Sequence, residues 1–350
     1  MGSRYLAESS NVAAYLSYFM PVNLSKVQVL LEELPPDTMV KEAGARLRFL
    51  DLGAGPGTGS LALLDWLHRY HPESATGLSA VAVDSSGEAL HRAGDLWNRY
   101  CQEAGISGAE LIRCQADLER SEKEPWRDKA KQQAQFDLIL LANCLNELYL
   151  DASDPIAART ALLADLLQWL APHGTLMLLE PALRETARAL HQVRDRLLRE
   201  KRCTVYSPCL HEQDCPALIH PDDWCHEERV WEAPVSIKEI DEEVGFIKDA
   251  LKFSYLLLRT DGRTIAPRTL HTFRIVSELR ELKGDTRAWV CNELGRSEIG
   301  RLDRSESDAN SAWSECHRGT IVQIDGLTRK EGATLARIPA DGTVEIVRPV

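Results

Sequence analysis

Three cysteines, two histidines and three prolines lie between Ser207 and Cys225, in a stretch that reads SPCLHEQDCPALIHPDDWC. The spacing Cys209-x5-Cys215-x9-Cys225 differs from the paired C-x2–4-C spacing of zinc fingers. Thiolates suit tetrahedral zinc or an iron–sulfur cluster, and iron–sulfur sites accept irregular spacing with one distant cysteine. A fourth ligand is needed, and the candidates are Cys203, His211, His226, Cys291 and Cys316. The stretch predicts a metal site, because free thiols clustered in this way would be prone to oxidation.

A second segment with chemical potential is DLGAGPGTG, which runs from Asp51 to Gly59. Glycines between a strand and a helix let the backbone approach a ligand closely, and the helix N-terminus adds its dipole. A dinucleotide-binding loop would read G-x-G-x-x-G/A, but Thr58 occupies its third glycine position and Pro56 lacks a backbone donor. The pattern D-x-G-x-G-P-G instead resembles the cofactor loop of class I S-adenosylmethionine-dependent methyltransferases.

This resemblance implies a set of cofactor-binding residues that follow successive strands of one sheet. In that family the loop wraps the methionine part of S-adenosylmethionine. By position, Asp84 would bind the ribose hydroxyls, Asp117 would meet the adenine amine, and Asn143 would lie near the transferable methyl group. The implied residues are Asp51, Gly53, Gly55, Gly57, Asp84, Asp117 and Asn143.

The residues that would catalyse methyl transfer are unknown from the sequence. The N/D-P-P-Y/F signature of amino-group methyltransferases is absent, and the corresponding place reads NCLNEL. Methylation at carbon 5 of cytosine needs a cysteine nucleophile, and Cys144 lies within this segment. A cysteine at the end of an apolar strand is more often simply buried.

A parallel sheet covered on both faces is predicted to position these residues. Apolar strands alternate with amphipathic helices, which is typical of α/β proteins. The expected strands are 47–52, 78–84, 111–116, 136–143 and 174–180, and the expected helices are 59–70, 87–103, 158–170 and 184–199. Residues 10–34 are predicted to form two helices that Pro21 separates.

The remaining chain predicts the end of this sheet and a second domain. TVYSPC fits a sixth strand and FSYLLLR an antiparallel seventh, with the cysteine-rich stretch inserted between them. Short alternating segments further on predict a small antiparallel β-domain. We therefore expect an α/β, Rossmann-like class I methyltransferase fold with a seven-stranded sheet. The expected parts are a helical segment (1–45), a methyltransferase-like domain (46–260) with the insertion (207–250), and a β-domain (261–350).

The cysteine stretch also carries a more specific resemblance. S-P-C-L-H-x3-C-P, then W-C-H and F-S-Y-L, all behind the G-A-G-P-G loop, resemble methyltransferase-like proteins associated with the small ribosomal subunit of bacteria and mitochondria. This resemblance implies a four-iron four-sulfur cluster. Its first three ligands map onto Cys209, Cys215 and Cys225, and the fourth onto Cys291, with Cys316 as the weaker alternative. A metal held by both segments would join the β-domain to the methyltransferase core.

Composition limits the partners. The net charge of −12 argues against indiscriminate nucleic-acid binding, so no DNA partner is expected. From Phe253 onward, 15 Arg and Lys face 14 Asp and Glu, which fits either an RNA-contacting part or a merely neutral domain. The longest apolar runs are too short to span a membrane. The chain is predicted to be cytoplasmic, with reduced cysteines.

The function predicted from these observations is an S-adenosylmethionine-dependent, methyltransferase-like protein that acts on ribosomal RNA of the small subunit or assists assembly of that subunit. Two alternatives remain open at this point. One is an assembly factor without catalytic activity. The other is a methyltransferase for a small molecule or a protein, with a structural zinc site.

Overall fold

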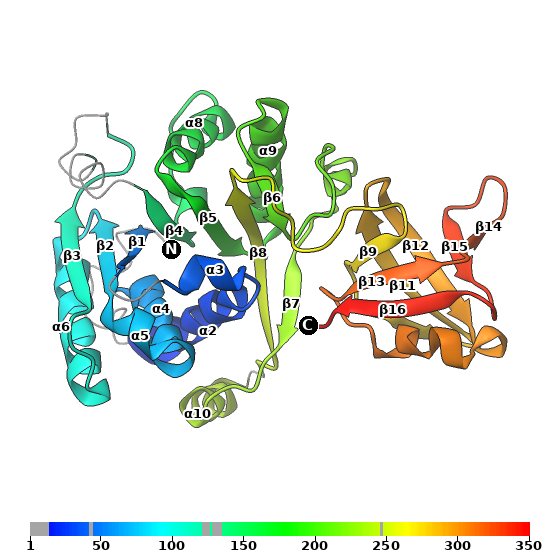
Figure 1. Cartoon of the computed structure of the whole chain (residues 1–350), viewed down its shortest axis with the longest axis horizontal. Coiled ribbons are helices and arrows are strands. Elements are labelled where there is room, and N and C mark those ends of the chain that lie inside the picture. Colours follow the sequence, from blue (N-terminus) through cyan, green and yellow to red (C-terminus); the bar gives the residue numbers. More distant parts are fainter. Residues whose placement is uncertain (1–13, 42–44, 121–126, 128–134, 246–247) are drawn as a thin grey trace.

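The computed structural model describes residues 14–41, 45–120, 127, 135–245 and 248–350, and it contains two β-sheets (Figure 1). Strands up to Arg259 form the first sheet, and strands from Thr272 onward form the second. Helices cover the faces of the first sheet, and the cysteine-rich stretch lies between the two sheets (Figure 1).

The first sheet has the strand order expected of a class I methyltransferase. In spatial order its strands are β3 (Glu110–Gln115), β2 (Leu78–Asp84), β1 (Leu47–Leu52), β4 (Phe136–Ala142), β5 (Leu170–Pro181), β8 (Ala250–Arg259) and β6 (Thr204–Ser207). The strands from β3 to β5 are parallel, and β8 runs antiparallel to both β5 and β6. The predicted fold class is therefore confirmed.

The sheet has one strand more than the seven predicted. The additional strand β7 (Glu227–Val230) belongs to the cysteine-rich insertion and pairs antiparallel with the first half of β8. The short β6 pairs only with the second half of β8, from Leu257 to Arg259. Because β8 is ten residues long, both short strands fit along the same edge.

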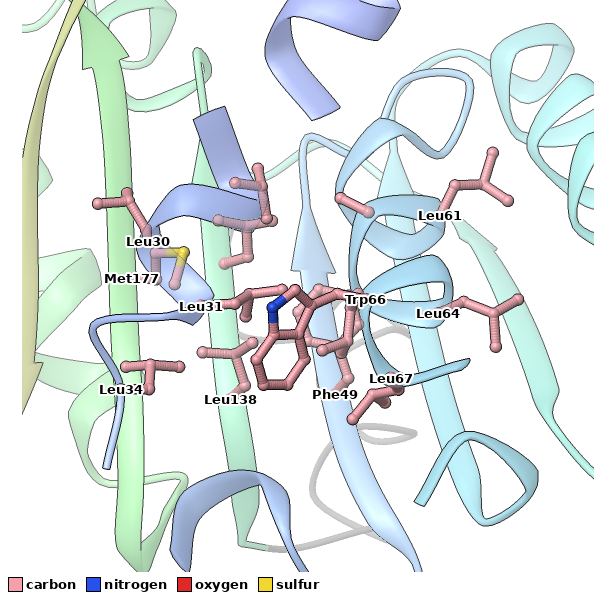
Figure 2. Close-up of a cluster of buried hydrophobic side chains, with 14 of the residues drawn as sticks. Leu30, Leu31, Leu34, Phe49, Leu61, Leu64, Trp66, Leu67, Leu138 and Met177 are labelled. Carbon is pink, nitrogen blue, oxygen red and sulfur yellow. The ribbon is translucent and has the colours of Figure 1, made fainter. Parts of the chain in front are cut away.

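Helices pack on both faces of this sheet because its strands are apolar on both sides. In β4, Leu138 and Leu140 belong to one hydrophobic cluster, whereas Ile139 and Leu141 belong to the other. Figure 2 shows the first cluster, with Trp66 lying between the helices α2 and α4 and the sheet. The helices are α2 (Met20–Leu31), α3 (Pro36–Met39), α4 (Thr58–Tyr70), α5 (Pro72–Thr76), α6 (Gly87–Ala104), α8 (Pro155–Leu167), α9 (Arg184–Arg199) and α10 (Val235–Val244).

The predicted break at Pro21 is wrong. The backbone stays in the right-handed helical region from the π-helical turn Tyr15–Phe19 through Met20 and into α2. Pro21 comes just after the π-helical turn, which the Met20 amide closes by donating to the Tyr15 carbonyl, and the helix continues through the proline.

The second sheet forms a small β-domain around the fully buried Trp313. In spatial order its strands are β14 (Thr328–Arg329), β15 (Leu335–Ile338), β12 (Gly295–Leu302), β11 (Asp285–Asn292), β9 (Thr272–Ile275), β13 (Ile321–Asp325) and β16 (Thr343–Arg348), and β10 (Arg280–Leu282) pairs with β11. Most neighbours are antiparallel, as predicted, but β12 and β15 are parallel.

Candidate cofactor and metal sites

The glycine loop adopts a conformation that only glycine accepts easily. Gly53, Gly55 and Gly57 all have positive φ, at 68°, 53° and 86°. At Gly53 a Cβ atom would lie only 2.3 Å from Cys144 Sγ, so this position also has no room for a side chain. The loop is tied to β2, since the amides of Gly53 and Ala54 both donate to the Val83 carbonyl.

Asp51 fixes the start of the helix that follows the loop. Its carboxylate accepts hydrogen bonds from the Ser60 amide at 2.8 Å and from the Ser60 hydroxyl at 2.7 Å. It thus caps α4, whose N-cap residue is a glycine without a side chain. Burial raises the pKa of the Asp51 carboxyl to about 6, although both Ser60 bonds oppose this shift.

The other predicted cofactor residues follow neighbouring strands at the same edge of the sheet. Asp84 ends β2, and its carboxylate accepts the amides of Gly55 at 2.9 Å and Ser86 at 2.8 Å. Asp117 follows β3, and its half-exposed side chain accepts the Glu119 amide at 3.0 Å. Asn143 directly follows β4 with φ of 53°. Strand C-terminal ends are where open α/β sheets bind ligands, so the structure brings the predicted residues to one ligand-binding edge.

Tyr15 is a residue of this edge that the sequence did not single out. Its hydroxyl lies 3.1 Å from Thr58 Oγ1, directly beyond the glycine loop. Burial raises the pKa of Tyr15, and the carboxylates of Asp51 and Asp84 act in the same direction. The N-terminal helical segment therefore covers the cofactor loop, a long-range contact that no local spacing reveals.

The segment after β4 is held by two buried charged side chains that were also missed. Glu180, at the end of β5, accepts the Asn146 amide at 3.3 Å and also the side-chain amide of Asn146. From the other side, Arg159 of α8 donates to the carbonyls of Leu148 at 2.9 Å and Asn146 at 2.8 Å. The segment that faces Gly53 is thus clamped between the sheet and a helix.

Cys144 is poorly suited to act as a nucleophile. Burial raises the pKa of its thiol well above the ordinary value, and the carboxylates of Glu180 and Asp84 raise it further. The thiolate is the reactive form of cysteine, and these surroundings suppress it. The structure therefore favours the buried, unreactive interpretation of Cys144.

Glu180→Gln is expected to flatten the pH dependence of unfolding between about pH 4.5 and 7. Burial raises the pKa of Glu180 from 4.5 to about 7, so the folded protein binds this proton more tightly than the unfolded chain does. The resulting stabilisation is full below pH ~4.5 and is lost as the pH rises through about 7. Glutamine does not ionise. The stability of Glu180→Gln relative to the wild type should therefore rise by ~1–3 kcal/mol from pH 5 to pH 8. Urea denaturation at both pH values measures this change.

The surface carboxylate Glu103, which pairs with Arg99 on the same helix, provides the matched control. Glu103→Gln should leave the pH dependence as in the wild type. Equal slopes for Glu180→Gln and Glu103→Gln would show that Glu180 does not titrate in this range.

The four cysteines of the predicted metal site line one cavity of about 50 Å³. Cys209 follows β6, Cys215 precedes a 3-10 turn, Cys225 precedes β7, and Cys291 lies in β11 of the second sheet. Burial raises the pKa of the Cys291 thiol well above its ordinary value, and the three other thiols raise it further. Cys291 is therefore within electrostatic range of all three, although it is far from them in sequence.

Of the four alternative ligands, two lie away from the cavity and two line it. Cys203 and Cys316 do not line the cavity. The Cys316 sulfur lies 3.3 Å from the Ala312 carbonyl inside the core of the β-domain. His211 and His226 do line the cavity, and in both rings Nδ1 is buried without a hydrogen-bond partner. The cavity thus favours Cys291 over Cys203 and Cys316 as the fourth thiol, and His211 and His226 line it as well.

The insertion is held in shape by side chains around the cavity. Trp224 Nε1 donates to the Ala182 carbonyl at 3.0 Å, and Ser254 Oγ donates to the Cys225 carbonyl at 3.1 Å. Arg188 of α9 donates to four carbonyls of the segment between Cys215 and Cys225: Ala217, Leu218, His220 and Asp223. These bonds fix an irregular loop that has little regular structure of its own.

A buried ionic network joins the N-terminal segment, the first sheet and the β-domain next to this cavity. Its members are Glu33, Ser207, Glu227, Arg229, Tyr255 and Arg274. Arg274 of β9 donates to Glu227 Oε2 at 2.6 Å and to the Tyr255 hydroxyl at 2.9 Å. Glu33, which follows α2, accepts from Arg229 at 2.6 Å. The cavity therefore lies where all three parts of the chain meet.

In the described ranges the four thiols line a cavity and are not drawn together around one point. Within the described ranges, no three His, Cys, Asp or Glu side chains are grouped so that they could hold one metal ion. The four thiols instead surround a cavity. A single zinc would need every ligand atom ~2.0–2.3 Å from one point, whereas an iron–sulfur cluster fills space between its four thiolates.

Most arginines of the β-domain that the structure describes are paired with a carboxylate. Nine of those after Arg259 are paired with a carboxylate: Arg263, Arg268, Arg274, Arg280, Arg287, Arg296, Arg301, Arg318 and Arg337. Five of the nine pair with carboxylates that precede Phe253, namely Asp37, Glu212, Asp223, Glu227 and Glu228, so these pairs tie the β-domain to the rest of the chain. Among the helices that the structure describes, none combines the length and apolar character needed to cross a membrane.

Comparison with known proteins adds a family. No curated protein was found to match the chain. Similar solved structures include a SAM-dependent methyltransferase of Leishmania major, with 16% identity over 72% of this chain and 78% of that one and a TM-score of 0.39. Another is an arsenic(III) S-adenosylmethionine methyltransferase of Chlamydomonas reinhardtii, with 18% identity over 73% and 83% of the two chains and a TM-score of 0.35. At such low TM-scores the fold assignment rests on the strand order alone.

A family model described as mitochondrial small ribosomal subunit Rsm22 matches residues 9–299. The match spans the glycine loop and all four cavity cysteines. The chain therefore belongs to the Rsm22 family.

Proposed function

We propose that this protein binds S-adenosylmethionine at the glycine loop, holds a four-iron four-sulfur cluster between Cys209, Cys215, Cys225 and Cys291, and acts on ribosomal RNA of the small subunit or assists assembly of that subunit. The observation that carries the proposal is the extent of the family match, because it includes both sites in one chain. The proposed compartment is the cytoplasm, where the nine free cysteines would stay reduced.

The cofactor part of the proposal is supported by the positions of the predicted residues. Asp51 and the three glycines shape the loop, and Asp84, Asp117 and Asn143 follow the next strands at the same edge. Bound S-adenosylmethionine would supply an electrophilic methyl group. The chain would contribute positioning of that group and exclusion of water under the cover of Tyr15.

The cluster part is supported by the arrangement of the thiols around a cavity. Cys291 comes from the β-domain and the other three cysteines from the insertion, so a bound cluster would link the two sheets. Metal binding would then contribute folding free energy directly. A structural zinc bound by the same thiols is the alternative that metal analysis distinguishes.

A function without turnover is favoured by one observation. The carboxylate of Glu180, which contributes to the raised pKa of Cys144, already accepts hydrogen bonds from the backbone and side-chain amides of Asn146. Deprotonation of a methyl acceptor by Glu180 would have to compete with these two bonds. Binding of the cofactor with assembly of the small subunit as the outcome is the second candidate function.

Three measurements on anaerobically purified protein test the proposal. Iron, sulfide and zinc analysis with an absorbance spectrum should give about four irons and four sulfides per chain. Calorimetry should detect S-adenosylmethionine binding. Incubation of purified small-subunit precursors with radiolabelled S-adenosylmethionine should show co-sedimentation, and labelled RNA would separate a methyltransferase from an assembly factor. One zinc per chain and no association with the precursor would refute the cluster and the ribosomal role.

A further inference from the structure

We propose that Arg194 of α9 is the buried counter-charge of the cysteine site, where its guanidinium fixes the Cys209–Cys215 loop and offsets the negative charge of a cluster bound by the four thiolates. This inference rests on the cluster part of the proposed function. It assigns a role to a side chain that does not line the cavity but lies directly behind two of the cysteines.

Arg194 is a fully buried cation whose contacts converge on the cysteine loop. Its side chain has no exposed surface. Nη1 donates to the Gln213 carbonyl at 2.9 Å, and Nη2 donates to the His211 carbonyl at 2.6 Å. Both carbonyls lie between Cys209 and Cys215, so one planar guanidinium sets the path of the loop that separates two thiols.

The positive charge of the Arg194 guanidinium also lies close to the Cys209 and Cys215 thiols. A buried cation beside ligand sulfurs favours the thiolate, which is the form that binds metal. Hydrogen bonds to ligand sulfurs and nearby charge are also the means by which a protein sets the reduction potential of an iron–sulfur cluster.

Asp195, the next residue of α9, contacts both Arg194 and the cysteine loop. Its Oδ1 pairs with Arg194, and its Oδ2 accepts the amide of Cys215 at 2.9 Å. Consecutive residues of one helix thus hold the loop between two cysteines, Arg194 through the carbonyls of His211 and Gln213 and Asp195 through the amide of Cys215. Nε of Arg194 remains buried without a hydrogen-bond partner.

Arg188 shows what the same helix does when only loop shape is required. It donates to four carbonyls between Ala217 and Asp223. Among the described residues it has no contact with a sulfur. Arg188 therefore positions a loop without acting on the thiolates. Arg196, two residues beyond Arg194, is partly exposed and pairs with Asp154, so it serves as a surface control on the same helix.

The test compares Arg194→Gln, Arg194→Lys, Asp195→Asn and Arg196→Gln as reconstituted holoproteins. Chelator competition measures cluster retention, and spectroelectrochemistry measures the reduction potential. Arg194→Gln should lose the cluster ~10–100-fold more readily and have a more negative potential. Arg194→Lys should retain the charge, and hence a potential near that of the wild type, with weaker retention. Asp195→Asn leaves the cation uncompensated and should shift the potential in the positive direction. Arg196→Gln should match the wild type.

Opposite shifts in potential for Asp195→Asn and Arg194→Gln identify the charge as the cause. If Arg194→Gln fails to fold, a positive shift of the potential in Asp195→Asn, together with a wild-type potential in Arg194→Lys, still supports the inference. Wild-type potentials in both Arg194→Gln and Asp195→Asn would overturn the inference while leaving the cluster in place. A wild-type protein without iron would overturn the proposed cluster and this inference with it.

Discussion

Replacing Cys291 by Ser is expected to remove the iron and sulfide of the purified protein almost completely and to loosen the β-domain from the methyltransferase-like sheet. Cys291 is the one cavity thiol that the second sheet contributes, through β11. Loss of one ligand should empty a four-thiolate site, and the free energy of metal binding would no longer stabilise the contact between the sheets. Cys209→Ser and Cys225→Ser should give the same result from the other side of the cavity.

Metal analysis, thermal unfolding and limited proteolysis measure these effects. In the wild type the two sheets should resist cleavage together, whereas in Cys291→Ser the segment between β8 and β9 should be cut at low protease concentration. Cys203→Ser and Cys316→Ala are the matched controls, because both residues were alternative ligands and neither lines the cavity. Both controls should retain about four irons. Full metal content in Cys291→Ser, or its loss in Cys316→Ala, would assign the fourth ligand elsewhere.

The contrast between Cys291 and Cys316 illustrates what the sequence could not decide by itself. Both cysteines follow Cys225 by more than sixty residues, and spacing alone does not rank them. The resemblance to a family favoured Cys291, and the geometry agrees because β11 faces the insertion while Cys316 points into the core of its own domain. Contacts between distant segments depend on how two sheets pack, and no local pattern contains that information.

The strand order was predictable for the opposite reason. Apolar strands that alternate with amphipathic helices specify a covered parallel sheet through local periodicity. The glycine loop then marks the first strand, and Asp84 and Asn143 mark the ends of two others. The eighth strand, β7, was missed because EERV is short and charged, and it becomes a strand only through pairing with β8.

Arg194 and Glu180 were missed because charged residues normally indicate exposed surface. A signal for Arg194 did exist. It lies four residues after Leu190 and three before Leu197, which places it on the apolar face of its helix. A charge at such a position indicates a buried partner, although periodicity does not identify that partner. Glu180 ends an apolar strand, and only the clamped segment after β4 explains its burial.

The largest effect on cofactor binding is expected from Gly53→Ala. The substitution encounters two separate obstacles. At φ of 68° an alanine is strained by roughly 1–2 kcal/mol. Its Cβ would also lie 2.3 Å from Cys144 Sγ and 2.7 Å from Cys144 Cβ. Cys144 cannot move away easily, since Glu180 and Arg159 clamp the segment that follows it. We therefore expect affinity for S-adenosylmethionine to fall at least ~100-fold, which corresponds to about 2.7 kcal/mol.

Two further variants separate the effect of backbone strain from the effect of overlap with Cys144. Gly105 ends α6 with φ of 67°, and no atom lies within 4 Å of the Cβ that an alanine would place there. Gly105→Ala should therefore carry a similar backbone strain, lower stability slightly and leave cofactor affinity unchanged. In the double variant Gly53→Ala/Cys144→Gly the overlap is gone while the strain remains, so part of the lost affinity should return. Calorimetric titration of all three variants measures these differences. Wild-type affinity in Gly53→Ala would show that the cofactor does not bind at this loop, because no ligand could approach a backbone displaced by the added methyl group without sensing it.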